Sequence, residues 1–127
     1  MIVQVIRLLV VLAALCVGCS SGQHRQAREK YNQGVAALQK QQLDEAAKLF
    51  LEARSEAGVD PELRFRAAYD LGLFHAAQSE AKKTADPPDL AAALALAEQA
   101  ESWFLDAARQ RPEDAATKAN LAVLRAR

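Results

Sequence analysis

From residue 24 onward, apolar residues recur every three or four positions, which is the spacing of an α-helix with one buried face. Short polar stretches that contain glycine, proline or glutamine interrupt this pattern four times. We therefore predict five helices, over residues 24–40, 43–56, 61–83, 87–110 and 113–126. No stretch alternates between apolar and polar residues as a half-buried strand does, so the predicted fold class is all-α.

Aspartate–proline pairs mark the start of two of these helices. Asp60 precedes Pro61, and an aspartate N-cap followed by proline is a typical helix start. Asp86 and Pro87 form a second such pair and predict a helix from residue 87. Gly58 suits the position just past the end of the preceding helix.

The first residues of the chain follow a different pattern. Residues 8–18 form an uncharged apolar run of 11 residues directly after Arg7. A membrane-spanning helix needs about 20 apolar residues, whereas the hydrophobic region of a secretory signal peptide needs only about 7 to 15. The run therefore predicts a signal peptide. An uncleaved membrane anchor is the alternative, if residues 2–6 are included in the membrane segment.

Both cysteines of the chain, Cys16 and Cys19, lie at the end of this run. A redox pair with this spacing would open a helix beside a strand, and no strand is predicted after it. Zinc would need two further ligands. The rest of the chain has two histidines, His24 and His75, and these two alone are too few to indicate a zinc site. We therefore predict no metal site and no cofactor.

The sequence CVGC of residues 16–19 resembles the lipobox of bacterial lipoproteins, although Cys16 stands where that family usually has leucine. The resemblance implies cleavage after Gly18 and a lipid on Cys19, which would hold the protein on a membrane. It divides the chain into a signal peptide (1–18), a lipidated cysteine with a polar linker (19–26) and a helical domain (27–127). It also implies a place in the cell envelope, facing the periplasm. Ser20 instead of aspartate after the cysteine favours the outer over the inner membrane.

Two stretches of the helical domain resemble tetratricopeptide repeats, which are helix pairs of 34 residues. The small and aromatic residues that mark the family recur in both stretches, as Gly34, Ala46, Phe50 and Ala53 and then as Gly72, Ala100, Phe104, Ala107 and Pro112. Leu121 falls where a third repeat would carry its leucine. The resemblance implies that each glycine lets the paired helix approach and that each phenylalanine fills a seam between helices. The expected fold is a short solenoid of two helix pairs and a C-terminal helix.

The second stretch departs from the family in length. Ala100 follows Gly72 by 28 residues instead of the expected twelve, so sixteen extra residues lie around the turn between the two helices. We predict that they lengthen both helices by about two turns each. The sequence LAAALALAEQA (90–100) favours this interpretation over an irregular loop, because alanine and leucine are strong helix formers.

Tetratricopeptide proteins bind their partners in a groove lined by first-helix residues. Matched position by position, the resemblance implies a groove lined by Arg28, Tyr31, Val35, Leu38, Arg66, Tyr69, Leu73 and Ala77. The two arginines occupy equivalent repeat positions, and so do the two tyrosines. Packing of both tyrosines between helices is the alternative to a role in binding.

The remaining polar residues form no pattern typical of catalysis. His75 lies on an apolar helix, and we interpret it as a packing residue, like Trp103. Asp70, Asp89 and Glu98 are interpreted as solvent-facing helix charges. The formal net charge is zero and no basic stripe is present, so we expect no nucleic-acid partner. Repeats of this kind are binding scaffolds, and we expect no small-molecule substrate.

We therefore expect the protein not to be an enzyme but a membrane-tethered adaptor, with envelope proteins as partners. Its plan looks like that of small lipoproteins that assist assembly of pili, secretins or outer-membrane proteins. The sequence RPEDAATKANLAVLRAR (111–127) also looks like repeat proteins of aerotolerance-type operons. A regulatory subunit of an envelope enzyme, such as a peptidoglycan hydrolase, is the alternative.

Overall fold

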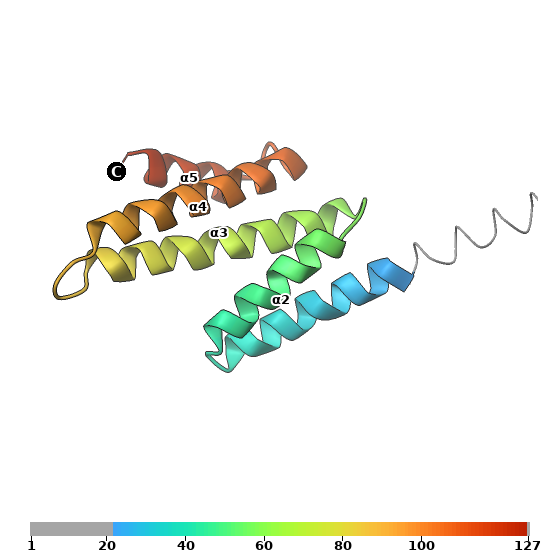
Figure 1. Ribbon diagram of the computed structural model, residues 1–127. Helices are drawn as coiled ribbons and strands as arrows, with labels where there is room; N and C mark the ends of the chain where they lie inside the picture. Colours follow the sequence, from blue (N-terminus) through green and yellow to red (C-terminus); the bar gives the residue numbers. More distant parts are fainter. Residues whose placement is uncertain (1–21, 127) are drawn as a thin grey trace, which may run out of the picture.

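Residues 22–126 of the chain are described by a computed structural model, and over this range they form helices and no strand (Figure 1). The first helix covers residues 22–39 and is followed by α2 (Leu43–Glu56), α3 (Pro61–Lys83), α4 (Leu90–Gln110) and α5 (Ala115–Arg125). The all-α prediction is confirmed, and α2 and α3 begin and end at the predicted residues. The predicted signal peptide (1–18) and Cys19 lie outside the described residues.

The first helix and α4 do not start where predicted. The first helix begins at residue 22, two residues before the predicted start at residue 24 and within the segment assigned to a linker (19–26). The predicted N-cap Asp86 does not start α4, because Asp89 caps it instead and its carboxylate accepts a hydrogen bond from the Ala92 N–H. The reason lies in the two adjacent prolines, since a residue that precedes proline is disfavoured in the helical conformation. Pro87 precedes Pro88, so the helix begins only after both.

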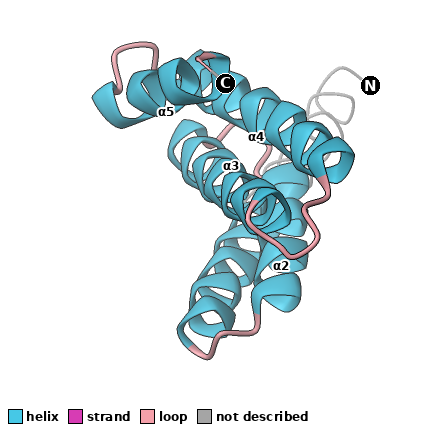
Figure 2. Ribbon diagram, turned by 90° about the vertical axis from the view of Figure 1, so that its left-hand side faces the viewer, coloured by secondary structure: helices cyan, strands magenta, loops and turns pink. Residues whose placement is uncertain are grey.

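The helices stack in chain order, as Figures 1 and 2 show. The first helix and α2 form one antiparallel pair, α3 and α4 form a second, and α5 packs on α4. α3 is the central helix, with α2 on one side and α4 on the other. Its buried residues accordingly spread over about half of the helix circumference instead of forming one narrow stripe. The arrangement is a short all-α solenoid of two helix pairs and a C-terminal helix.

A glycine faces a buried phenylalanine within each helix pair. A Cβ atom at Gly34 would lie 2.7 Å from the ring of Phe50, and one at Gly72 would lie 2.7 Å from the ring of Phe104. Both rings are almost fully buried, at 2% and 1% exposure. Since glycine alone lacks a Cβ, only glycine lets the ring come this close.

Each phenylalanine also packs against a leucine from the helix that begins the following repeat. Leu71 of α3 shares a buried cluster with Phe50, and Leu121 of α5 shares one with Phe104. Two hydrogen bonds also join α2 and α4, the second helices of the two pairs, because Arg54 donates to both carboxylate oxygens of Asp106 at 2.5 and 2.8 Å. Each helix pair is thus held in place by contacts with the helices that follow it.

The sixteen-residue insertion lengthens both helices of the second pair, as predicted. α3 has 23 residues and α4 has 21, against 14 in α2, and residues 84–89 form the turn between them. Near the turn, the buried Ser79 hydroxyl donates to the Ala93 carbonyl at 2.7 Å and ties the two helices together. The end of this hairpin projects beyond α2, at the left of Figure 1.

Candidate interaction surface

The eight predicted groove residues are divided between two depressions and the core. Arg28, Tyr31 and Arg66 line a polar depression of about 270 Å³, together with Asn32, Asp60, Glu62 and Leu63. We call it the arginine pocket. Leu38, Leu73 and Ala77 line a separate apolar depression. Val35 and Tyr69 line neither, and both pack against the core.

Arg28 holds the aspartate that starts α3. Its Nε and Nη2 both donate to one carboxylate oxygen of Asp60, at 2.9 and 2.6 Å, while the other oxygen accepts from the Leu63 N–H. Burial by itself would raise the pKa of Asp60, but the Leu63 N–H and the guanidinium outweigh it and hold this pKa below its ordinary value. Arg28 is therefore part of the fold as well as of the pocket.

Arg66, in contrast, forms its ion pair with an exposed carboxylate. Its Nε donates to Glu62 at 2.5 Å, one turn earlier on α3, and Arg111 pairs with the same carboxylate. The side chain of Arg66 is 57% exposed, and that of Arg28 is 66% exposed. The Arg66–Glu62 pair is exposed on both sides, and exposed ion pairs contribute only about 0–1 kcal/mol, so the Arg66 guanidinium can exchange partners at little cost.

Tyr31 links the pocket to α3. Its hydroxyl donates to the Asp70 carboxylate at 2.8 Å, and its ring packs on Phe50. Burial, and next the neighbouring carboxylate, raise the pKa of Tyr31 well above its ordinary value. Burial also raises the pKa of Asp70, against the opposing effects of the Tyr31 hydroxyl and Arg66. The interpretation of Asp70 as a solvent-facing charge was therefore wrong.

Tyr69 is held between helices, which is the alternative that the sequence left open. Its ring stacks on Phe65 and meets the edge of Phe104, and its hydroxyl accepts a hydrogen bond from Asn120 of α5 at 3.2 Å. The pocket therefore contains one of the two predicted tyrosines. His75, with its pKa lowered by burial, and Trp103 are both half-buried, in line with packing roles.

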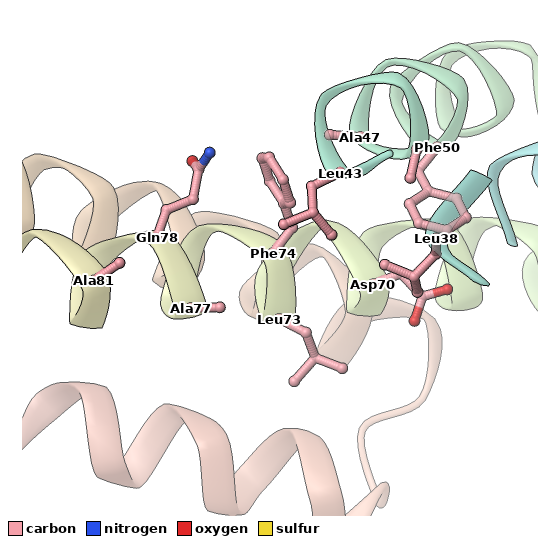
Figure 3. Close-up of a pocket in the computed structure, with 11 residues that line it drawn as sticks. Leu38, Leu43, Ala47, Phe50, Asp70, Leu73, Phe74, Ala77, Gln78 and Ala81 are labelled. Carbon is pink, nitrogen blue, oxygen red and sulfur yellow. The ribbon is translucent and has the colours of Figure 1, made fainter. Parts of the chain in front are cut away.

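The apolar depression, which we call the notch, lies between α2 and the projecting half of α3 (Figure 3). It encloses about 310 Å³ and is lined by Leu38, Leu43, Ala46, Ala47, Phe50, Asp70, Leu73, Phe74, Ala77, Gln78 and Ala81. Three leucines remain open to solvent there, with exposures of 46% for Leu38, 51% for Leu43 and 43% for Leu73. Sequence analysis did not find Leu43 or Phe74; the signal was the insertion, which lengthens α3 past the end of α2.

Other kinds of site find no support between residues 22 and 126. No group of histidine, cysteine and carboxylate side chains in this range is arranged to hold a metal ion. No helix in the same range is long and apolar enough to cross a membrane.

Comparisons with protein-family models, with curated proteins and with solved structures give no match.

Proposed function

We propose that the protein is a membrane-tethered adaptor of a bacterial envelope complex, built on tetratricopeptide-like repeats. The repeated packing supports the repeat assignment. Tyr31 donates to Asp70, the residue before Leu71, and Tyr69 accepts from Asn120, the residue before Leu121. In both repeats the tyrosine therefore contacts the residue just before the leucine of the next repeat. The contact between glycine and phenylalanine is also present in both repeats.

The observation that carries the adaptor function is the exposure of Arg28 and Arg66 around one pocket. Both occupy the same repeat position, and both are more than half exposed. Arginine beside tyrosine is a combination enriched where binding energy concentrates in protein interfaces. The guanidinium nitrogens not used by Asp60 and Glu62 remain available for a partner, and arginine binds carboxylates with two parallel hydrogen bonds. We propose that the pocket binds an acidic segment of an envelope protein.

The tether is the lipid on Cys19, outside the described residues. Two or more acyl chains on one residue give stable anchoring, whereas a single chain binds only reversibly. The helical domain would start close to the membrane, because the first helix is formed from residue 22. An adaptor placed in this way would hold its partner at the periplasmic side of the membrane.

Removal of the Arg66 side chain tests this function. In full-length protein purified from solubilised membranes, Arg66→Ala should weaken the partner complex about tenfold, which is about 1.4 kcal/mol. The melting temperature should not change, because Arg66 is exposed and holds no buried group. Affinity is measured against the partner identified by co-purification with the parent protein. Arg28→Ala is unsuitable, because it would also remove the partner of the buried Asp60 carboxylate.

Lys48→Ala is the matched control, because Lys48 is an exposed cation of α2 that lines neither depression. It should bind the partner as the parent does. Loss of the complex in Lys48→Ala, with no effect of Arg66→Ala, would place the interface on the opposite face and refute the role of the pocket.

A further inference from the structure

The notch exists because the two helix pairs differ in length. α3 has nine residues more than α2, 23 against 14, which corresponds to roughly 13 Å of helix. α2 and α3 are joined at the ends formed by Glu56 and Pro61, so the excess lies at the other end, where α3 continues past α2 with α4 on its other side. The notch borders α3 from Asp70 to Ala81 and so includes most of the part of α3 that projects.

The surfaces around this space are those of a helix interface. Phe74, Ala77 and Ala81 of α3 recur at spacings of three and four residues, and Leu43, Ala47 and Phe50 do so on α2. Small residues between larger ones form the grooves and ridges into which another helix packs. An exposed apolar surface rimmed by polar groups marks an interaction site in a soluble domain.

The charges around the notch indicate which helix fits. Asp70 lines the inner end of the notch, and the first turn of α2, which borders the notch through Leu43, carries Asp44 and Glu45 outside its lining. Within residues 22–126, neither Asp44 nor Glu45 has an ion-pair partner among the salt bridges. A fitting helix would therefore have an apolar face and would end in basic residues. The projecting half of α3 itself meets this description, because its last turn carries Lys82 and Lys83.

We propose that the projecting half of α3 from a second copy of this chain fills the notch, in a two-fold symmetric dimer. The two α3 helices would run antiparallel and cross near Ala77, where their alanines allow close approach. Because the helices run antiparallel, Lys82 and Lys83 of each copy would lie near the acidic residues around the notch of the other copy.

Self-complementarity supports a second copy over an unrelated helix. In a two-fold interface the same patch serves both subunits, so its projection must match its own recess. Here the insertion lengthens α3, and the same segment of α3 both projects and lines the notch. The arginine pocket is not used by this contact, so each copy could still bind an envelope partner.

Charge reversal on full-length protein tests the dimer, by sedimentation equilibrium in a density-matched detergent. The parent chain should sediment as a dimer. Lys82→Glu with Lys83→Glu should weaken the dimer at least tenfold, because like charges then meet. Addition of Asp44→Lys and Glu45→Lys to the same chain should restore the dimer to within about threefold of the parent, since the pairs are re-formed with opposite sign.

Two further variants separate the notch from the rest of the hairpin. Ala77→Glu should abolish the dimer, whereas Ala91→Glu, at another exposed alanine that lies on α4 outside the notch, should not. A parent chain that is monomeric at all concentrations would overturn the proposal and leave the notch to another protein. A dimer that survives Ala77→Glu, or a fourfold charge variant that stays monomeric, would overturn it equally. The effect of Arg66→Ala on binding of the envelope partner is measured in a separate experiment. Its outcome does not depend on whether the dimer forms.

Discussion

Replacement of Gly72 by leucine should be the most damaging single change to the stability of the helical domain. A Cβ atom at this position would lie 2.7, 2.8 and 2.9 Å from three carbons of the Phe104 ring, and this ring is only 1% exposed. Overpacking of a core costs about 1–3 kcal/mol or more, and here the buried ring would have to shift to make room for the leucine. The loss should exceed the gain of about 1 kcal/mol from replacing a glycine within a helix. Thermal unfolding followed by circular dichroism should show a drop of about 4–8 °C for each kcal/mol lost.

The matched control is Gly22→Leu, because a Cβ atom at Gly22 has nothing within 4 Å. This variant should have the same melting temperature as the parent protein. Gly34→Leu should repeat the loss, since the Phe50 ring lies equally close to Gly34. A Gly72→Leu variant as stable as the parent would show that the contact between glycine and phenylalanine does not hold the helix pairs together, and the repeat assignment would lose its main support.

Substitution of Cys19 by alanine should have the largest effect on processing. We expect accumulation of the uncleaved precursor and complete loss of lipid labelling, because the thiol that accepts the lipid is removed. Cys16→Ala should be processed and labelled like the parent, which makes it the matched control in the same sequence. Metabolic labelling with a fatty acid, followed by gel electrophoresis, measures both effects. A Cys19→Ala protein that is cleaved and released in soluble form would indicate an ordinary signal peptide and would remove the tether from the proposed function.

Local signals in the sequence were sufficient for most helix bounds. α3 begins where Asp60 and Pro61 predict, because an N-cap carboxylate and a proline act within one turn of the helix. Gly58 has a φ of +57°, the left-handed conformation expected just past a helix end. The same reasoning failed at Asp86, because a second proline follows the first and shifts the start of α4 to the next aspartate.

The candidate surfaces depended on contacts between distant residues and could be predicted only in part. The repeat positions predicted that Arg28 and Arg66 share one surface, and both line the arginine pocket. No local pattern shows that Arg28 pairs with Asp60, 32 residues later, or that Asp70 is half-buried under Tyr31. These contacts depend on how the two helix pairs cross, which periodicity does not specify.

The notch followed from the insertion, but only through three-dimensional packing. The sixteen extra residues predicted longer helices, and α3 and α4 are long. The sequence did not show that the first pair would leave the added turns of α3 uncovered, because that depends on where α2 begins relative to α3. Leu43 is apolar in the sequence like any core residue, and only the structure shows that 51% of it stays exposed.

Photo-crosslinking in intact cells tests the adaptor function most directly. A photoreactive amino acid placed at Asn32, an exposed residue of the arginine pocket, should crosslink the lipidated protein to one envelope protein. The same amino acid at Lys48 should not, and Arg66→Ala should reduce the Asn32 crosslink about tenfold. Crosslinks from Lys48 but none from Asn32, or an Asn32 crosslink that is insensitive to Arg66→Ala, would contradict the proposal that this pocket binds the partner.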